Sequence, residues 1–537
     1  MHFSRVHPVN ELTSPGPDRR RWALAVLCLS LIVVTVDTTI LNVALPSLVA
    51  SLHAGSSGLE WIVDAYTVVF AGLLLSAGSL GDRFGRRGAL IAGLAVFAIG
   101  SGASALAESS GRLIALRALT GLGAALVFPA TLSILTNLFP DPVERQRAIA
   151  VWAGTAGIGI AIGPVAGGLL LRHFYWGSVF VVNVPICLVA IAAAALLVPT
   201  SRDTDERPLD PPGALLSIVG LSALVYAVIE GPSRGWGSAV VLSAFAFAVV
   251  VLGTFVLVEL HHASPLLDLR LFRNPRFSAA SLAVTSLYFC LFGVIFFQTQ
   301  HLQFVLGYDP LGAGLRSVPF AAVLLVVANT TPRLVHRVGT RAVVTSGLII
   351  VAVSMLGRAT FTVHSGYPAI LVTQCLFALG MALTIAPATA SIMGAVPPGR
   401  AGVGSAINDT TRQVGGALGV AVMGSVGASL YRRSAGHALA TVHLPAAAAA
   451  QARNSVGPAL AVARSLPAPI GATVADAARH AFIRGSDAAS LVGVGVAVGG
   501  VLLAWRFLPA GMRTGAPMRA EDELPGAELA MAVGAEG

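Results

Sequence analysis

The chain has 537 residues, of which 55% are hydrophobic and only 11% are charged, and its mean hydropathy is +0.80. Soluble domains carry about 25% charged residues, so this composition excludes an ordinary soluble protein and indicates an integral membrane protein. The 34 basic residues are all arginine and give a net charge of +9, which we interpret as loop residues facing anionic lipid rather than a nucleic-acid surface.

Apolar runs of about 20 residues predict membrane-spanning helices along the whole chain. The first run follows Arg19, Arg20 and Arg21 but is too long for a cleaved signal peptide, so we expect it to remain as a helix. Fourteen spans are predicted, near residues 22–45, 59–80, 88–107, 112–138, 147–171, 176–199, 213–230, 237–259, 278–299, 311–330, 341–362, 367–391, 406–429 and 487–508.

The distribution of arginine predicts the orientation. The predicted loops on one side are rich in Arg, whereas the short loops on the other side hold only Arg112, Arg172 and Arg234. The Arg-rich side is therefore expected to be cytoplasmic, and an even number of spans places both termini there. The expected organisation is a cytoplasmic tail over 1–21, one half over 22–200, two inserted helices over 201–260, a second half over 278–508 and a disordered cytoplasmic tail over 509–537. The second half includes an extracellular loop, 430–486, whose alanine content suggests one or two surface helices.

A basic loop occurs twice between apolar runs. Residues 78–87 read Gly-Ser-Leu-Gly-Asp-Arg-Phe-Gly-Arg-Arg, and residues 332–341 read Pro-Arg-Leu-Val-His-Arg-Val-Gly-Thr-Arg. The shift between these loops matches the shift between the first and ninth spans, so spans one to six and nine to fourteen are interpreted as repeats. Parallel repeats of this kind occur in transporters, where the substrate site lies near the bilayer midplane between the halves.

Spans one and four each carry a charged residue. An acid such as Asp37 is costly inside an apolar helix and is a functional candidate by default, here for taking up and releasing a proton. Arg117 in span four stays protonated in a protein, and its expected role is to modulate a nearby carboxylate, with Asp37 as the first candidate. A purely structural ion pair is the alternative for both residues.

Span five is rich in glycine at regular spacing. Gly159, Gly163 and Gly167 recur every four residues, so they share one helix face and allow another helix to approach closely. Pro164 is expected to bend the helix, and Gly168 completes a Gly-Pro-x-x-Gly-Gly string. Two further strings introduce polar residues into spans, one with Asn183 in span six and one with Arg412 in span thirteen.

Other polar residues at membrane level are candidates for a substrate pocket. The candidate pocket residues are Asp64, Tyr66, Glu230, Gln298 and Arg412.

The four cysteines lie inside spans without metal-ligand spacing, so neither a metal site nor a disulfide is predicted.

These motifs together resemble the major facilitator superfamily, in particular the fourteen-spanner drug/proton antiporters of the EmrB/QacA type. The resemblance implies an all-α integral membrane protein with the major facilitator fold, built from two six-helix repeats and two inserted central helices. It also implies proton coupling through Asp37 and an antiporter signature in span five, typical of exporters. A departure is Thr120, which stands where the superfamily often has Gln. A second departure is His336, which replaces Asp82 in the second loop, so only the first loop is expected to act as a latch between the halves. The implied latch residues are Gly78, Asp82, Arg83, Gly85, Arg86 and Arg87.

The implied function is proton-driven export of hydrophobic or amphipathic drugs by alternating access, in a cell membrane. The expected partners are the lipid bilayer, protons and small hydrophobic or cationic substrates; nucleic acid and cofactors are not expected, and the protein is expected to be monomeric. A dedicated exporter of one endogenous metabolite, antibiotic or lipid precursor is the alternative. A membrane enzyme is disfavoured because the histidines are scattered over loops on both sides and no nucleophile or metal motif occurs. The sequence has no P-loop, so ATP is not expected as the energy source.

Overall fold

A computed structural model describes residues 17–139, 141–200, 210–262, 265, 269–396, 401–440, 442 and 444–509. At some helical positions, including 82–84 and 401–406, it describes the backbone without the side chain. The predicted tails over 1–21 and 509–537 lie outside the described residues, apart from the few that adjoin the first and last helices.

Every regular element in the described ranges is a helix. The first half contains α1 (Pro17–Leu52), α2 (Ser56–Phe84), α3 (Arg86–Ser104), α4 (Ser110–Leu138), α5 (Pro142–His173), α6 (Ser178–Val181) and α7 (Asn183–Leu197). Two inserted helices follow, α8 (Pro211–Arg234) and α9 (Ala239–His261). The second half contains η1 (Leu269–Arg273), α10 (Pro275–Gln300), η2 (His301–Val305), α11 (Pro310–Leu315), α12 (Val318–Val338), α13 (Thr340–Arg358), α14 (Tyr367–Met393), α15 (Ala401–Ala438), α16 (Ala446–Asn454), α17 (Val456–Ser465) and α18 (Ala468–Phe507).

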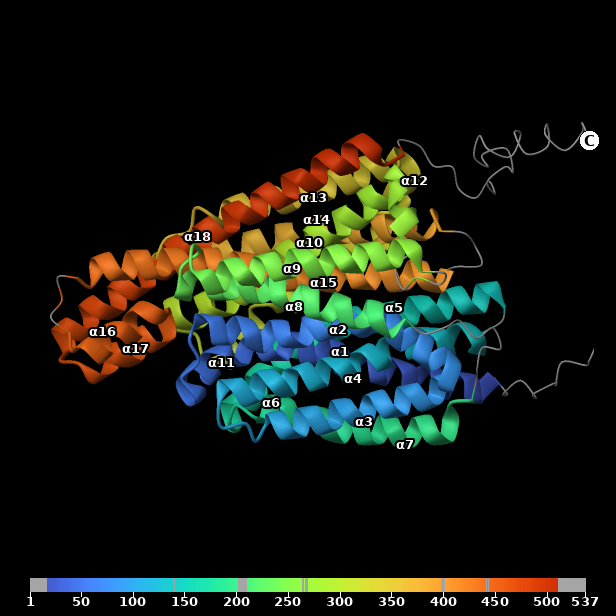
Figure 1. Ribbon diagram of the computed structural model, residues 1–537, viewed down its shortest axis with the longest axis horizontal. Coiled ribbons are helices and arrows are strands. Elements are labelled where there is room, and N and C mark those ends of the chain that lie inside the picture. The colour runs from blue at the N-terminus through green and yellow to red at the C-terminus, as the bar shows by residue number, and fades with distance from the viewer. Residues whose placement is uncertain are drawn as a thin grey trace, which may run out of the picture.

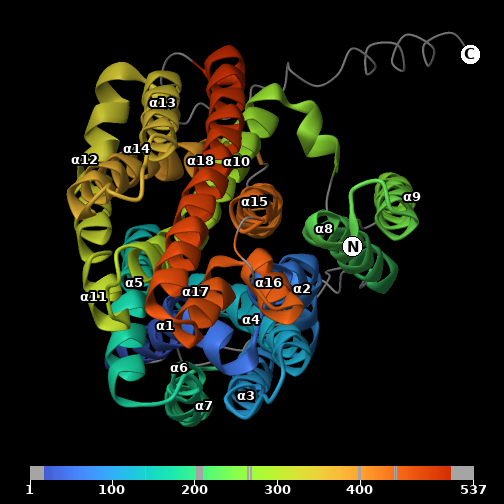
Figure 2. The ribbon, with the colours of Figure 1, turned by 90° about the vertical axis from the view of Figure 1, so that its left-hand side faces the viewer.

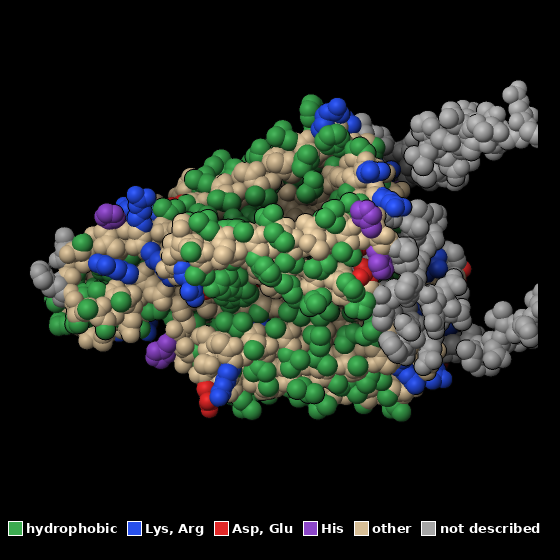
Figure 3. All heavy atoms as spheres, viewed as in Figure 1, with side chains coloured by type: hydrophobic (Ala, Val, Ile, Leu, Met, Phe, Trp, Pro, Cys, Tyr) green, Lys and Arg blue, Asp and Glu red, His purple; other side chains and the backbone are tan. Residues whose placement is uncertain are grey.

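The helices are built to cross a bilayer. Among the described residues, 13 helical segments are long and apolar enough to span a membrane. The fifth predicted span corresponds to α5, whose 32 residues exceed the length of about 20 that spanning requires. Hydrophobic side chains cover the middle of the face shown in Figure 3, while Arg and His gather toward its two ends. The predicted all-helical membrane fold is confirmed.

The two halves pack side by side, and the inserted helices lie at their edge. Figure 2 shows α8 next to α2 and α15, with α9 outside it. Only 11% of the α9 span is buried, compared with 67% of the span formed by α10. The halves meet mainly where α2 packs on α15 and α5 packs on α11. One apolar cluster runs through this boundary and includes Leu45 and Val49 of α1 together with Phe289 and Phe297 of α10.

The tenth predicted span is broken into α11 and α12 at Arg316 and Ser317. Pro319 lacks the backbone N–H that would continue the helix. The carbonyl oxygen of Arg316 instead accepts hydrogen bonds from the Tyr367 hydroxyl at 3.1 Å and from Gln374 Nε2 at 2.8 Å. Such partners are needed because unsatisfied backbone groups are costly inside a membrane.

The segment 430–486 contains two short helices, as its alanine content suggested, but it also extends the spanning helices on both sides. α15 continues to Ala438 and α18 already begins at Ala468, so much of the segment extends two spanning helices. The short helices α16 and α17 pack against these extensions and form a cap, which projects from the left end of the molecule in Figure 1. Arg432 stabilises it by donating to Pro232 O at 2.8 Å and to Asn454 Oδ1 at 3.1 Å. We call this end of the molecule the capped end.

Candidate functional site

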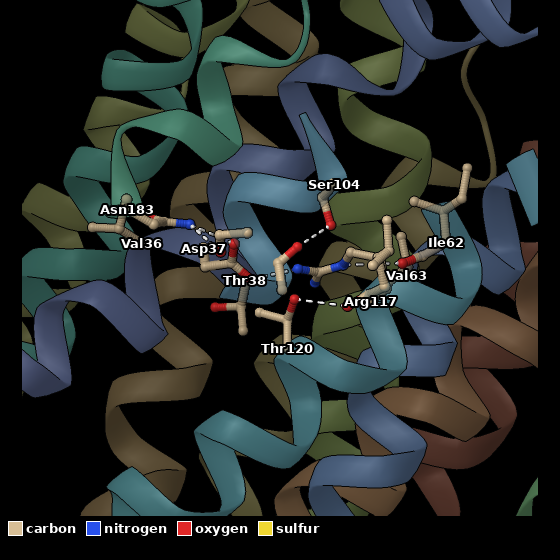
Figure 4. A network of polar contacts seen from close by, with 12 residues as sticks. Val36, Asp37, Thr38, Ile62, Val63, Ser104, Arg117, Thr120 and Asn183 are labelled. Carbon is tan, nitrogen blue, oxygen red and sulfur yellow. Dashed lines mark hydrogen bonds and ion pairs between the residues drawn. The ribbon is translucent and has the colours of Figure 1, made fainter. Parts of the chain in front are cut away.

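A buried ion pair lies in the first half, between α1 and α4. Arg117 Nη1 donates to Asp37 Oδ2 at 2.6 Å, as Figure 4 shows. The Asp37 side chain is 0% exposed and that of Arg117 is 1% exposed. The structure therefore brings together the two charged residues that the sequence singled out in spans one and four.

Both partners of the ion pair have further contacts. Asn183 Nδ2, at the start of α7, donates to Asp37 Oδ1 at 2.8 Å and lies 3.3 Å from Ser101 Oγ. Arg117 Nε donates to the Ile62 carbonyl at 3.3 Å, and its guanidinium lies 4.4 Å from the centre of the Tyr66 ring. Removing two charges from water is costly. These contacts offset that cost because they supply hydrogen-bond partners to Asp37 Oδ1 and Arg117 Nε, which the ion pair itself does not engage.

Asn183 is a site residue that sequence reasoning used only for identity. Its polar amide at the beginning of an apolar span was the available signal, but its partner on α1 depends on the tertiary fold. Thr120 behaves differently, because its hydroxyl bonds back to the Leu116 carbonyl at 2.8 Å and does not reach Asp37. In this chain the amide on α7 therefore supplies the second contact to the carboxylate.

We expect Asn183→Ala to lower the free energy of unfolding by about 1.5–3 kcal/mol, because it removes a buried hydrogen bond to a charged group. Thermal and denaturant unfolding of the purified protein would measure the change. Asn137→Ala is the matched control, since the exposed Asn137 amide donates only to Ser133 O of its own helix. Equal losses in the two variants would contradict the assigned role of Asn183.

The glycines of α5 place this helix between the two halves. A Cβ at Gly163 would lie 3.0 Å from Thr39 Cβ and 3.1 Å from the Val36 carbonyl oxygen, so this face packs directly on α1. A Cβ at Gly168 would lie 2.6 Å from both Leu311 Cα and the Pro310 carbonyl oxygen of α11. Gly159 and Gly167 likewise face α1, and Pro164 faces α11 at Gly314. The glycine-rich sequence of α5 thus contacts α1 in its own half and α11 in the other half.

A central cavity lies between the halves, lined by α1 and α5 of the first half and by α10, α12 and α14 of the second. Thr39, Asn42 and Val43 of α1 line it, whereas Asp37 points from the same helix toward Arg117 and Asn183 and is not among the lining residues. Gln298 and Gln374 form a polar contact of 2.9 Å in its opposite wall. A mostly apolar cavity with few polar groups is the usual form of a small-molecule site. The lining residues are Thr39, Asn42, Val43, Pro164, Leu291, Val294, Ile295, Gln298, Thr299, Ser317, Phe320, Ala321, Gln374 and Phe377.

The other predicted pocket residues are not gathered around this cavity. Asp64 is 0% exposed and has no hydrogen-bond partner among the described residues, and Tyr66 lies under Arg117. Glu230 contacts Arg234 at 3.0 Å, and Arg412 contacts Asp409 at 3.4 Å. Of the five residues, only Gln298 lines the central cavity.

A further buried acid, Glu60, was not singled out by the sequence. It lies four residues before Asp64 on α2, so the two acids share a helix face. This spacing was the signal that could have identified it. Glu60 is 1% exposed, and its Oε2 accepts a hydrogen bond from Ser425 Oγ of α15 at 3.4 Å.

The basic loops occupy equivalent places in the two halves. Gly85 separates α2 from α3 with φ of 106°, and Gly339 separates α12 from α13 with φ of 85°, a region that favours glycine. Arg87 donates to Val198 O beyond α7 at 3.3 Å, and Arg341 donates to Leu508 O beyond α18 at 2.6 Å. Each half therefore ties its third helix to the end of its last one.

The remaining latch residues are described only in part. The backbone of Gly78 belongs to α2, and Arg86 is buried at the start of α3. The side chains of Asp82 and Arg83 lie outside the described residues. Their role as a latch stays a prediction.

Comparison with known proteins identifies one matching family and several similar transport and resistance proteins. The family model "Major Facilitator Superfamily" matches residues 27–420. The chain is 37% identical to "Multidrug efflux pump LfrA" of Mycolicibacterium smegmatis, over 88% of this chain and 93% of that protein. It is 34% identical to "Methyl viologen resistance protein SmvA" of Salmonella typhimurium, over 86% and 93%. The "Tetracenomycin C resistance and export protein" of Streptomyces glaucescens is 32% identical, over 90% and 91%.

Among solved structures, the chain resembles a bacterial homologue of the human lysosomal transporter Spinster. The TM-score is 0.65 at 18% identity, and the match covers 93% of this chain and 100% of that one. At this identity the similarity supports the fold.

Proposed function

Because the chain belongs to the Major Facilitator Superfamily, whose members are transporters and not enzymes, we propose that it exports hydrophobic or amphipathic drugs in exchange for protons. It is a multi-pass membrane protein with multidrug efflux pumps among its relatives. The observation that carries the proposed coupling is the buried Asp37–Arg117 ion pair, whose acid lies on α1, the helix that also lines the central cavity.

In the proposed mechanism the two halves rock around the central cavity and expose it to each side of the membrane in turn. A proton on Asp37 would neutralise the carboxylate and weaken its contact with Arg117. Asp37 lies on α1, whose other face packs on the glycines of α5. Because α5 also contacts α11, a shift of α1 would displace the contact between α5 and α11. One proton that moves down a potential of 100 mV supplies about 2.3 kcal/mol for this cycle.

We also propose membership of the fourteen-spanner EmrB/QacA type, with both termini in the cytoplasm and the capped end outside a plasma membrane. Two observations support this assignment. The helices α8 and α9 are inserted between the halves, and Arg is concentrated in the loops at the end opposite the cap. In this arrangement residues 78–87 act as a cytoplasmic latch.

Substrate-driven proton release tests the proposed function. We expect wild-type protein in proteoliposomes to release protons when a cationic antiseptic or dye is added, because bound substrate displaces the proton from the coupling acid. A pH-sensitive dye would record the release, and a protonophore should abolish substrate accumulation. Accumulation that persists after the proton gradient has collapsed would contradict antiport.

A dedicated exporter is the second candidate function. It is favoured by relatives named for single compounds, such as the "Cephamycin export protein CmcT" of Amycolatopsis lactamdurans, 38% identical over 75% of this chain. A panel of unrelated drugs distinguishes the two functions. Proton release with several of them supports multidrug export, whereas release with one compound class alone supports the dedicated exporter.

A further inference from the structure

A chain of side-chain hydrogen bonds runs along the wall that the second half contributes to the central cavity. Arg358 Nη1, at the end of α13, donates to Gln298 Oε1 of α10 at 3.2 Å. Gln298 Nε2 then donates to Gln374 Oε1 of α14 at 2.9 Å, and Gln374 Nε2 donates to the Arg316 carbonyl at 2.8 Å. Both glutamines line the central cavity. The chain thus joins a buried cation to the break between α11 and α12 by way of the cavity wall.

The two ends of this chain fix the direction of every hydrogen bond in it. A guanidinium group has no acceptor, so Arg358 can only donate, and the Arg316 carbonyl can only accept. The amide oxygen of Gln298 must therefore face Arg358, and its amide nitrogen must face Gln374. A reversed amide in either glutamine would set two donors or two acceptors against each other. Arg358 is 3% exposed and Gln374 is 1% exposed, so water does not relieve such a mismatch.

This orientation leaves one N–H group of Gln298 over. An amide nitrogen carries two hydrogens, and Gln374 accepts only one of them; no other described residue accepts from this nitrogen. Because Gln298 lines the cavity, the second N–H is left for whatever occupies it. The guanidinium strengthens this donor, since hydrogen bonds in a chain polarise one another. By contrast, the hydroxyls of Thr39 and Ser317, which also line the cavity, already donate to backbone carbonyls.

We propose that Gln298 is a specificity-determining residue of the central cavity, and that it selects substrates with a hydrogen-bond acceptor, such as a ketone or ether oxygen, at this position. Arg358 is its positioning residue, because it keeps the amide oxygen of Gln298 turned toward itself. The same wall is otherwise largely apolar, with Leu291, Val294 and Phe377, so a substrate donor placed there would be buried without a partner. This inference rests on the proposed export function and specifies a chemical feature of the substrate.

Three uncharged tricyclic ligands of nearly the same size test the site. Fluorenone carries a carbonyl oxygen, carbazole carries an N–H donor, and fluorene carries a methylene at the equivalent place. Equilibrium dialysis would measure their binding to the full-length protein in lipid nanodiscs, with empty nanodiscs as the blank for partition into lipid. We expect wild type to bind fluorenone about threefold to tenfold more tightly than fluorene, the range for one neutral hydrogen bond, and more tightly than carbazole.

Gln298→Glu is the decisive variant, because it replaces the N–H group by an acceptor oxygen without a change of size. The new carboxylate can still accept from Arg358. We expect the preference to reverse, so that carbazole, which donates to the carboxylate, binds more tightly than fluorenone, while the affinity for fluorene stays as in wild type. Gln451→Glu makes the same chemical change on the exposed surface of the cap and should keep the wild-type preference.

The positioning role of Arg358 is tested by the same ratio of affinities, because a purely structural role would weaken all three ligands alike. Arg358→Met should remove most of the preference for fluorenone, since the Gln298 amide is then held at its nitrogen alone. Arg358→Lys keeps a charged donor and should retain part of the preference. A wild-type preference in Arg358→Met would overturn this role.

A further variant guards against misfolding. If Gln298→Glu does not fold, Gln298→Met keeps the bulk, removes the N–H group and should bind fluorenone and fluorene alike. A wild-type preference in either Gln298 variant would overturn the proposal, as would a wild-type protein that binds fluorenone no better than fluorene. Proton release from the same preparations is measured separately, so the proposed selectivity can fail while antiport stands.

Discussion

Asp37→Asn is expected to abolish substrate-driven proton release, because the amide cannot take up the proton that the carboxylate exchanges. The variant should also lose about 3–5 kcal/mol of stability, since Arg117 would remain buried without a charged partner. The loss of stability should be large because the contact is 2.6 Å long and both side chains are excluded from solvent. Proteoliposome proton release and thermal unfolding would measure the two effects on the same preparations.

A double variant separates coupling from stability. Removing both charges leaves no unpaired buried ion, whereas removing one leaves Arg117 without a charged partner. Asp37→Asn/Arg117→Gln should therefore regain stability without regaining proton release. Release equal to wild type in Asp37→Asn would instead move the coupling to another acid, with Asp64 and Glu230 as the next candidates.

Gly168→Val is expected to reduce transport by about tenfold or more while leaving the packing within each half intact. The new side chain would meet the backbone of Pro310 and Leu311, which cannot rotate away as a side chain could. Overpacking of this kind costs about 1–3 kcal/mol, and each 1.4 kcal/mol changes a conformational equilibrium tenfold. The closed contact between α5 and α11 would become the disfavoured state. Substrate efflux and the distance between spin labels on the two helices would report the change.

Gly154→Val provides the matched control, on the same helix. A Cβ at Gly154 would meet nothing within 4 Å, so the same substitution adds its bulk to open space. The control should transport like wild type. If both variants lose activity equally, helix propensity rather than the contact between the halves would explain the effect of Gly168→Val.

The spans could be predicted from sequence because each is an apolar run of sufficient length. Their breaks and extensions could not. Pro46 lies inside an unbroken α1, whereas Pro319 accompanies a break that Tyr367 and Gln374 stabilise from another helix. The extensions of α15 and α18 at the capped end lack an apolar run, and they are held by hydrogen bonds such as those of Arg432. These features depend on tertiary partners that local sequence does not contain.

Some residues of the candidate site could likewise be predicted from the sequence, and others could not. Asp37 and Arg117 stand out because charged residues are rare inside apolar helices. Asn183 and Glu60 do not stand out, because each lies near a span end, where polar residues are common. Only the fold places the Asn183 amide on Asp37 and encloses Glu60 among aromatic rings.

The peripheral position of α9 has a consequence for how its sequence can change over time. With 11% of its span buried, most of its side chains lie on the outer surface, where lipid accepts any apolar shape. Drift among Val, Leu, Ile, Ala and Phe along this helix is therefore nearly neutral. By contrast, α10 is 67% buried, and each replacement there must fit the neighbours that surround it. Among related chains, both helices should therefore remain equally hydrophobic. Residue identity at individual positions should be retained only in α10.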